Sequence, residues 1–398
     1  MTAPYAAALP PGVADAILEL RRNLHRHPER SFEEHRTATR LEEALRAVPG
    51  LDIRRVAGTG VVARLRGRRP GGPVIAVRGD IDALPIQEQT GVPWASGTPG
   101  VMHACGHDVH AAWTVGAAHL LAANPPEGDL LFVLQPAEET GRGAAAMLAS
   151  GALDDVSAII GAHVDMRFPV GTLVAEPGPI AGSTDEFHII VSGRGGHAAR
   201  PHEARDPVVA AAAIITALQT IVARRLAPGE PAVVTVATVH AGTAANVIPE
   251  EAVLSGTLRA VTARTRAALQ DAVARTAESV AAAHEVHAAV RVMTGTPPIV
   301  NAAGPIAWAR EAAVAVLGPD PFRTLPEPNL GGEDFAFYLE RMPGCFLRIG
   351  AGSGDGPPPA AHTPRFLPAE HAALVGAVVL AETARRAASA LARGRSSG

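Results

Sequence analysis

The chain has 398 residues, a length that predicts two or three domains and a large apolar core. Its 35 Lys and Arg residues nearly balance its 39 Asp and Glu residues, which leaves a net charge of −4. This balance excludes the basic surface that binding to nucleic acid or to an anionic membrane requires, and it favours a small-molecule substrate.

Targeting, membrane and disulfide signals are weak in this sequence. The first twenty residues include Pro10 and Pro11 and contain no basic segment followed by an apolar one, so a cytoplasmic location is expected. The most apolar stretch, Pro207–Ala223, carries polar residues at helical spacing and predicts a buried helix rather than a membrane span. With two cysteines, Cys105 and Cys345, a disulfide framework is not expected.

Helical patterns and apolar runs alternate along both ends of the chain. An amphipathic pattern from Val13 to Val48 is interrupted at His27-Pro28, because the residue before a proline is disfavoured in a helix. Strands are then expected at Val61–Leu65, Val74–Arg78, Leu130–Gln135, Val156–Ala162 and Phe346–Gly350, and helices at His107–Ala123 and Glu370–Leu391. This alternation predicts an α/β catalytic domain with a mostly parallel sheet covered by helices.

The middle of the chain predicts a second unit, of the α+β class. Strands are expected at Glu186–Val191, Ala232–His240, Ala252–Arg259 and Val286–Val292, one helix beginning at Pro207 behind an Asp206 cap, and another helix at Thr262–Ala283. The order β-α-β-β-α-β is the ferredoxin-like, split βαβ motif, whose ends are close enough for insertion into another domain. We therefore expect a catalytic domain at 1–183 and 296–398, and an inserted domain at 184–295.

Five residues with metal-binding side chains lie where expected strands end or where a helix begins. Cys105 and His107 precede a helix, Glu139 follows a strand, and His163 and His362 follow two other strands. Loops at the carboxyl ends of parallel strands converge on one crevice, so these side chains can meet there. Each residue alone is explained as well by a buried thiol, a helix cap or a solvated turn, but their joint placement favours a metal site.

Neighbouring polar residues leave alternatives open. His103 and His110 are rival ligands, although His110 lies nearly a turn into the helix and suits core packing equally well. Glu138 can reach a water molecule while its neighbour binds metal. Asp80 and Asp82 follow a buried run and can orient ligand histidines, but a surface turn explains them nearly as well.

Seven runs of residues resemble the motifs of the metal-dependent amidohydrolases, the family of hippurate hydrolase, bacterial N-acyl-amino-acid deacylases and plant indoleacetyl-amino-acid hydrolases. In chain order they are Gly79–Ile86, Met102–Asp108, Gln135–Glu139, Gly195–Ala199, Asn246–Pro249, Gly256–Ala260 and Gly332–Phe335. The likeness extends from about Leu20 to Ala384. It implies that the inserted unit is a lid through which two subunits form a homodimer.

The resemblance also implies roles for individual residues. The ligands of a centre with two divalent ions (Zn, Mn, Co or Ni) are then Cys105, His107, Glu139, His163 and His362. Glu138 becomes the general base, His197 stabilises the oxyanion, and Asn246 and Arg259 hold the substrate's carboxylate. Asp108 joins the two aspartates named above in supporting the ligands. The ions would lower the pKa of a shared water from about 15.7 toward about 7 and polarise the scissile carbonyl.

The expected reaction is cleavage of an N-acyl or N-aroyl amino acid to a carboxylic acid and a free amino acid. Residues 140–143 and 164–167 depart from many relatives near the expected acyl pocket, so the acyl group is left open. A metal-dependent dipeptidase or carboxypeptidase is the alternative. A cysteine hydrolase that uses Cys105 and a nearby histidine leaves Glu139, His163 and His362 without a role. A non-catalytic binding protein has no need of both Glu138 and a complete ligand set.

Overall fold

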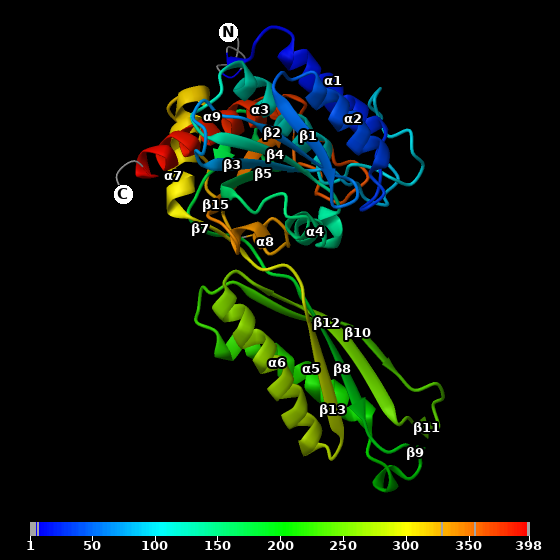
Figure 1. Ribbon diagram of the computed structural model, residues 1–398. Helices are drawn as coiled ribbons and strands as arrows, with labels where there is room; N and C mark the ends of the chain where they lie inside the picture. Colours follow the sequence, from blue (N-terminus) through cyan, green and yellow to red (C-terminus); the bar gives the residue numbers. More distant parts are fainter. Residues whose placement is uncertain (1–4, 6–7, 328, 354–355, 396–398) are drawn as a thin grey trace. The chain divides into compact units, whose positions relative to one another are not determined.

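The computed structural model describes residues 5, 8–327, 329–353 and 356–395, which form two compact units (Figure 1). The first, called the α/β unit here, consists of Met1–Gly178, Val300–Pro326 and Asp334–Gly398. The second, called the inserted unit, consists of Pro179–Ile299 and Glu327–Glu333. Two short strands, β7 (Gly178–Ala181) and β14 (Ile299–Asn301), pair where the chain passes from one unit to the other.

A seven-stranded mixed sheet forms the centre of the α/β unit, in the order β1-β2-β4-β3-β5-β15-β6. Its strands are β1 (Leu51–Val56), β2 (Gly60–Leu65), β3 (Val74–Asp80), β4 (Asp129–Gln135), β5 (Val156–Pro169), β6 (Leu173–Val174) and β15 (Gly344–Gly352). The four strands β4, β3, β5 and β15 are parallel, as expected, whereas β1, β2 and β6 pair antiparallel at the edges. The fold class predicted from the sequence is confirmed.

Helices cover the sheet of the α/β unit on both faces (Figure 1). They are α1 (Val13–Arg26), α2 (His35–Arg46), α3 (His107–Ala123), α4 (Gly143–Ala149), α7 (Ala303–Leu317), α8 (Ala336–Leu339) and α9 (His371–Arg395). One face is covered by helices that pack side by side and enclose the main apolar core: α1, α3, α7 and α9. The short helices α4 and α8 lie on the opposite face of the sheet (Figure 1). The helical pattern expected from Val13 to Val48 forms two helices, with Pro28 in the break.

The inserted unit has a four-stranded antiparallel sheet in the order β10-β12-β8-β13, with β9 and β11 forming a separate pair. Its elements are β8 (Asp185–Ser192), β9 (Gly196–His197), α5 (Pro207–Arg225), β10 (Ala232–Ala241), β11 (Val247–Ile248), β12 (Glu251–Ala260), α6 (Ala263–Ala283) and β13 (His287–Thr294). Helices α5 and α6 pack on one face of the sheet. The expected β-α-β-β-α-β order is present, and Asp206 caps α5 through the Val208 amide.

Helix α5 corrects one expectation, that of a buried helix. By length and composition α5 could cross a membrane. A third of its most apolar segment is buried, because one face of the helix packs on the sheet while the other face is exposed. Val208 and Val209 on its outer face are 43% and 54% exposed. The polar residues Thr216 and Thr220 bond to carbonyls of the same helix and lie on this exposed side.

Candidate metal centre

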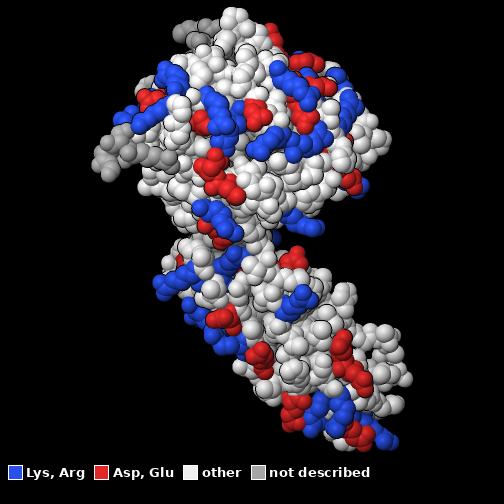
Figure 2. All heavy atoms as spheres, viewed as in Figure 1, with Lys and Arg blue, Asp and Glu red and all other residues white. Residues whose placement is uncertain are grey.

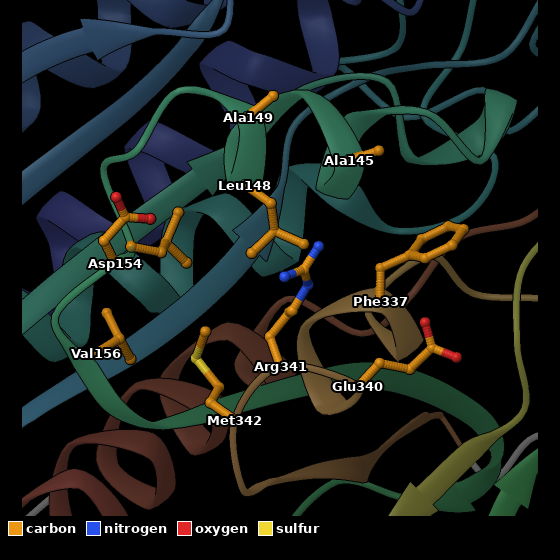
Figure 3. Close-up of a pocket in the computed structure, with 10 residues that line it drawn as sticks. Ala145, Leu148, Ala149, Asp154, Val156, Phe337, Glu340, Arg341 and Met342 are labelled. Carbon is orange, nitrogen blue, oxygen red and sulfur yellow. The ribbon is translucent and has the colours of Figure 1, made fainter.

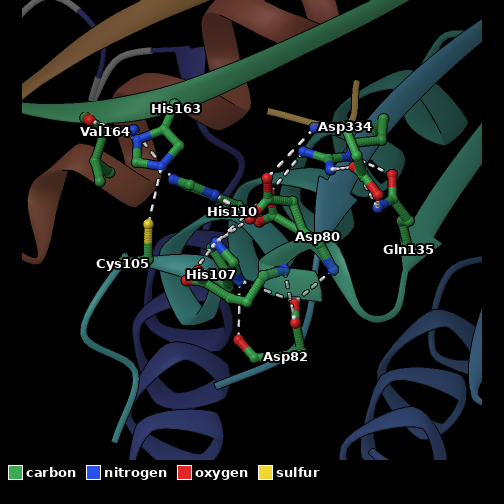
Figure 4. A network of polar contacts seen from close by, with 12 residues as sticks. Asp80, Asp82, Cys105, His107, His110, Gln135, His163, Val164 and Asp334 are labelled. Carbon is green, nitrogen blue, oxygen red and sulfur yellow. Dashed lines mark hydrogen bonds and ion pairs between the residues drawn. The ribbon is translucent and has the colours of Figure 1, made fainter. Parts of the chain in front are cut away.

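The turn before α3 brings Cys105 and His107 to the carboxyl ends of the parallel strands. Gly106 has φ 97°, and a Cβ atom there would lie 2.6 Å from Val164, so only glycine suits this turn. The Cys105 Sγ atom lies 3.3 Å from Nε2 of His163 on β5 (Figure 4). The other ring nitrogen of His163 is 2.8 Å from the Val164 carbonyl, to which it can donate, so Nε2 faces the thiol as a possible ligand atom.

The paired glutamates follow β4 in a short 3-10 turn, Glu138–Thr140. A carboxylate oxygen of each lies 3.8 Å from Nε2 of His107, and Glu139 also lies 3.5 Å from Nε2 of His362. Burial raises the pKa of Glu139 to about 7, with the neighbouring aspartates adding to the effect. The five expected ligands and the expected base therefore converge within the α/β unit.

The chemistry of these side chains fits divalent cations. Of the groups whose possible ligand atoms lie within 4.8 Å of one another, three share members here: Cys105 with His107 and His163, Cys105 with Glu139 and His362, and His107 with Glu138 and Glu139. Nε2 of His107 and Oε1 of Glu139 are buried and make no hydrogen bond within the described residues. Buried polar atoms are rarely left in this state, so a cation at the centre would satisfy both. Burial also raises the pKa of the Cys105 thiol, which a bound cation would deprotonate.

Asp82 holds two parts of the centre in place. Nδ1 of His107 lies 2.9 Å from the Asp82 carbonyl oxygen and 3.1 Å from Asp82 Oδ1, and these contacts direct Nε2 of that ring toward the glutamates (Figure 4). The same carboxylate accepts the backbone N–H groups of Glu138 and Glu139, each at 3.1 Å, and the Ser31 hydroxyl at 2.7 Å. Asp82 is therefore buried with its oxygens fully used.

His110 on α3 links the end of β3, at Asp80, to β5, at Val164. Nδ1 of His110 lies 2.6 Å from Asp80, while its Nε2 accepts the Val164 amide at 3.0 Å (Figure 4). His110 also forms a group of possible ligand atoms with Asp80 and His107. Both of its ring nitrogens are occupied by these hydrogen bonds, however, so we assign His110 to support of the chain beside His163. Burial opposes the charge of Asp80, but Arg78 at 2.6 Å and the adjacent histidines hold its pKa well below the usual value.

Asp108 and His103 face away from the centre, toward α1. Asp108 lies 2.8 Å from both Arg21 and His25, and these contacts hold its pKa far below the usual value despite burial. The His103 ring is buried, and neither of its nitrogens makes a hydrogen bond within the described part of the chain. Burial lowers the pKa of His103 to about 4. The rival ligand His103 belongs to none of the groups of possible ligand atoms found among the described residues.

Three expected substrate-site residues lie in the inserted unit. His197 on β9 pairs with Val247 on β11, and the Asn246 carbonyl accepts the Ala198 amide at 3.1 Å, so His197 and Asn246 are neighbours. Arg259 lies near the other end of β12, eight positions after Glu251, which corresponds to about 26 Å along an extended strand. The inserted unit therefore brings together the first two residues but not the third.

A buried polar network that was not predicted from the sequence lies beside the centre. Arg78 bonds to Gln135 at 2.8 Å and to Asp334 at 3.1 Å, and Gln135 and the Ala144 amide also donate to Asp334 (Figure 4). The side chain of Arg78 is fully buried on β3. An arginine at the end of an apolar strand, directly before two aspartates, was the available signal, because buried arginines require paired carboxylates.

A separate hollow of about 510 Å³ lies between α4, α8 and the beginning of β5 (Figure 3). It is lined by Ala145, Leu148, Ala149, Leu153, Asp154, Val156, Phe337, Glu340, Arg341 and Met342. Val156 is the first residue of β5, whereas His163 lies seven positions further along the strand. None of the ten lining residues is a predicted site residue, so the hollow is distinct from the metal centre.

Comparison with known proteins decides the family. The model of peptidase family M20/M25/M40 matches residues 76–386. The chain belongs to this family. It is 41% identical to an N-acetylcysteine deacetylase of Bacillus subtilis over 92% of this chain and 96% of that protein. It is 36% identical to the IAA-amino acid hydrolase ILR1-like 2 of Arabidopsis thaliana over 94% of this chain and 85% of that protein.

A solved structure supports the same assignment. The Bacillus subtilis YXEP protein, a dinuclear metal-binding peptidase of the M20 family, superposes with a TM-score of 0.83 and 39% identity over 94% of this chain and 98% of that chain. As an M20-family member, this chain is a metal-dependent hydrolase that acts on amide bonds. The resemblance recognised in the sequence is therefore confirmed.

Proposed function

We propose that the chain hydrolyses the amide bond of N-acyl or N-aroyl amino acids, using two divalent ions in each subunit. The observation that carries this proposal is the convergence of thiol, imidazole and carboxylate groups around the unsatisfied Nε2 atom of His107 and Oε1 atom of Glu139. The similarity to an N-acetylcysteine deacetylase and to a hydrolase of IAA-amino acids supports the substrate class.

The five ligands are assigned as Cys105, His107, Glu139, His163 and His362. Cys105 belongs to two of the ligand groups, one with His163 and one with Glu139 and His362, so it would help to hold both ions. Bound ions supply positive charge that polarises the scissile carbonyl and makes water more acidic. The mixed ligand set accepts zinc, manganese, cobalt or nickel.

Glu138 is assigned as the general base. Its carboxylate lies next to the ligand His107, and the Asp334 amide at 3.4 Å faces its Oε1 atom, which fixes its position. Glu138 takes a proton from the attacking water as the oxygen–carbon bond forms. It then delivers that proton to the amine nitrogen as the carbon–nitrogen bond breaks, which leaves a carboxylic acid and a free amino acid.

The inserted unit is assigned as a lid that supplies substrate-binding groups. His197 is exposed and can donate a hydrogen bond to the oxyanion of the tetrahedral intermediate. Asn246 and Arg259 are assigned to the carboxylate of the substrate. Because Arg259 lies far along β12 from the other two, we propose that His197 and Asn246 come from the partner copy in a homodimer.

The proposed dimer surface is the outer side of the inserted unit. Strand β10 lies at the edge of the four-stranded sheet, where it pairs with β12 alone among the described strands, and Val239 on it is 51% exposed. Val208 and Val209 add an apolar surface on α5. We expect Val239→Glu and Val209→Glu to shift sedimentation from dimer toward monomer; a wild-type monomer at micromolar concentration would contradict this assignment.

The experiment that tests the function uses metal-stripped protein reloaded with Zn, Mn, Co or Ni. Its substrates are N-acetyl, N-benzoyl and indoleacetyl amino acids and, for the dipeptidase or carboxypeptidase alternative, dipeptides with a free amino end. Metal-restored cleavage of the N-acyl series, lost in Glu138→Gln, is the expected result. Preferential cleavage of free dipeptides would favour the alternative, and activity that survives both stripping and the variant would overturn the proposal.

A further inference from the structure

A fully buried glutamate outside the proposed ligand set touches the loop that carries the catalytic glutamates. Glu34 is the residue before α2, and its side chain has no exposure. The Thr59 hydroxyl donates to Oε2 at 2.5 Å, and the Ala137 amide donates to Oε1 at 2.9 Å. Buried carboxylates are rare, and burial raises the pKa of this one. Burying a carboxylate costs free energy of folding, so we expect this side chain to have a specific role in the structure.

The residue that Glu34 holds has an unusual backbone conformation. Ala137 is buried, has φ 54° and ψ 38°, and directly precedes Glu138. This left-handed conformation is unfavourable for a residue with a Cβ atom, and it persists only where the surroundings impose it. It also determines the direction in which the chain leaves β4.

Two buried carboxylates together hold three consecutive backbone N–H groups in this loop. Glu34 accepts the N–H of Ala137, and Asp82 accepts those of Glu138 and Glu139. Asp82 fixes the two glutamates from one side. The peptide that precedes them is held on its N–H by Glu34 and on its carbonyl, that of Pro136, by Gln135 at 3.3 Å. Glu34 therefore holds the amide N–H at the point where the left-handed turn begins.

We propose that Glu34 is a positioning residue, which imposes the left-handed conformation of Ala137 and thereby directs Glu138 toward the water and Glu139 toward the metal. This inference rests on the proposed function of the two glutamates. It assigns to Glu34 a geometric role, acceptance of one amide N–H, and not a requirement for its charge.

Two substitutions separate geometry from charge. Glu34→Asp keeps the carboxylate but shortens its reach by one methylene, so the Ala137 amide loses its partner. Glu34→Gln loses the charge but keeps a carbonyl oxygen for that amide and an NH₂ group for the Thr59 hydroxyl. We expect Glu34→Asp to lower kcat by about 10- to 100-fold with a smaller change in KM, and Glu34→Gln to stay close to wild type.

Glu29 provides a matched control near the same helix. Its carboxylate accepts the Arg36 and Thr37 amides at 3.1 and 2.7 Å, which caps α2 without touching the glutamate loop. Glu29→Asp should lower the thermal midpoint while kcat stays unchanged. Metal retention against a chelator is measured beside kcat, and we expect Glu34→Asp, but not Glu29→Asp, to release metal more readily.

The substitution Ala137→Gly tests the left-handed turn directly. Glycine adopts this conformation without a Cβ penalty, so the loop should depend less on Glu34. Glu34→Asp should therefore cost less kcat in the Ala137→Gly background than in wild type. An equal loss in both backgrounds, or full kcat and metal retention in Glu34→Asp, would overturn the inference.

Two further measurements keep the test decisive. If Glu34→Asp does not fold, Thr59→Val, which removes the donor to Oε2, should lower kcat in the same direction by a smaller factor; unchanged kcat would overturn the inference. Glu138→Gln is assayed in parallel. Activity in that variant would refute the proposed function, whereas an inactive Glu138→Gln beside a fully active Glu34→Asp would refute the positioning role alone.

Discussion

The Sγ atom of Cys105 lies 3.3 Å from Nε2 of His163, although 58 residues separate them in the chain. One comes from a turn ahead of α3 and the other from β5. Their approach at the ends of parallel strands places a thiol and an imidazole where a single cation can bind both.

Cys105→Ala should abolish tight metal binding and amide cleavage, because it removes a ligand shared by two groups. The matched control is Cys345→Ala. Cys345, on β15, is also buried, but its Sγ faces the carbonyl of Pro305 on α7 at 3.8 Å. Metal content after dialysis, measured by elemental analysis, should fall only in Cys105→Ala. Loss of metal in both variants would point to a general packing defect instead.

Glu138→Gln should lower kcat by about 10²- to 10⁴-fold, the usual contribution of a general base, while metal content stays at the wild-type level. The amide keeps the shape of the side chain but cannot take a proton. Glu340→Gln, an exposed glutamate on the separate hollow, is the control. A variant at position 138 that loses both metal and activity would make Glu138 a ligand instead of the base.

Metal binding should strengthen as pH rises through about 7, because Glu139 must be deprotonated to act as a ligand and burial raises its pKa to about 7. Without metal, the raised pKa means that the folded state holds the proton more tightly than the unfolded state. This contribution to stability is present below about pH 4.5 and is lost as pH rises through about 7. The gain in thermal midpoint on adding zinc should therefore grow between about pH 5.5 and about pH 8. A gain that is independent of pH would contradict this account.

The His25 ring should make folding stability fall at alkaline pH. Its nitrogens lie 2.8 Å from Asp108 and 3.1 Å from Glu88, and because carboxylates only accept, the ring must be protonated at both. Burial opposes this charge, but Asp108 and Glu88 outweigh it and raise the pKa of His25. The stabilisation is complete below about pH 6.5 and is lost as pH rises through the folded-state pKa. Urea unfolding of His25→Gln should lack this pH-dependent part; identical pH slopes in the two proteins would contradict the prediction.

Gly376→Ala should destabilise the α/β unit by about 1 to 3 kcal/mol, through overpacking. A Cβ atom at Gly376 on α9 would lie 2.2 Å from the Trp113 ring on α3. Gly304→Ala is the control, since a Cβ atom there meets no atom within 4 Å. Chemical denaturation should separate the two variants. Equal stability of both would show that the two helices can shift apart without cost.

Much of the α/β unit was predictable because its signals are local. Buried parallel strands are continuous apolar runs, so β3, β4 and β15 were located closely, and the helix at His107–Ala123 was predicted to the residue. Strand β1 was missed because it is an edge strand with alternating exposure and little apolar character. The outer face of α5 was misjudged because composition reports how apolar a helix is, not which face it packs.

The candidate site divides in the same way. Cys105, His107 and the paired glutamates were predicted from their joint placement at a strand end and a helix start, since each of them alone also fits a buried thiol, a helix cap or a solvated turn. The sequence admits His110 as a rival ligand, and the hydrogen bonds of its two ring nitrogens with Asp80 and Val164 are what argue against that role. Asp108 was expected to support the ligands, yet it pairs with Arg21 and His25 on α1.

By itself, then, the sequence determined the fold class, the metal-binding chemistry and the family, because periodicity, residue type and ordered motifs are properties of the chain alone. The tertiary structure decided which polar groups meet. Glu34 and Ala137 are 103 positions apart, and Arg78 and Asp334 are 256 apart. No local pattern encodes such pairs, since they form only when strands and helices distant in sequence pack together and each buried charge must find a partner.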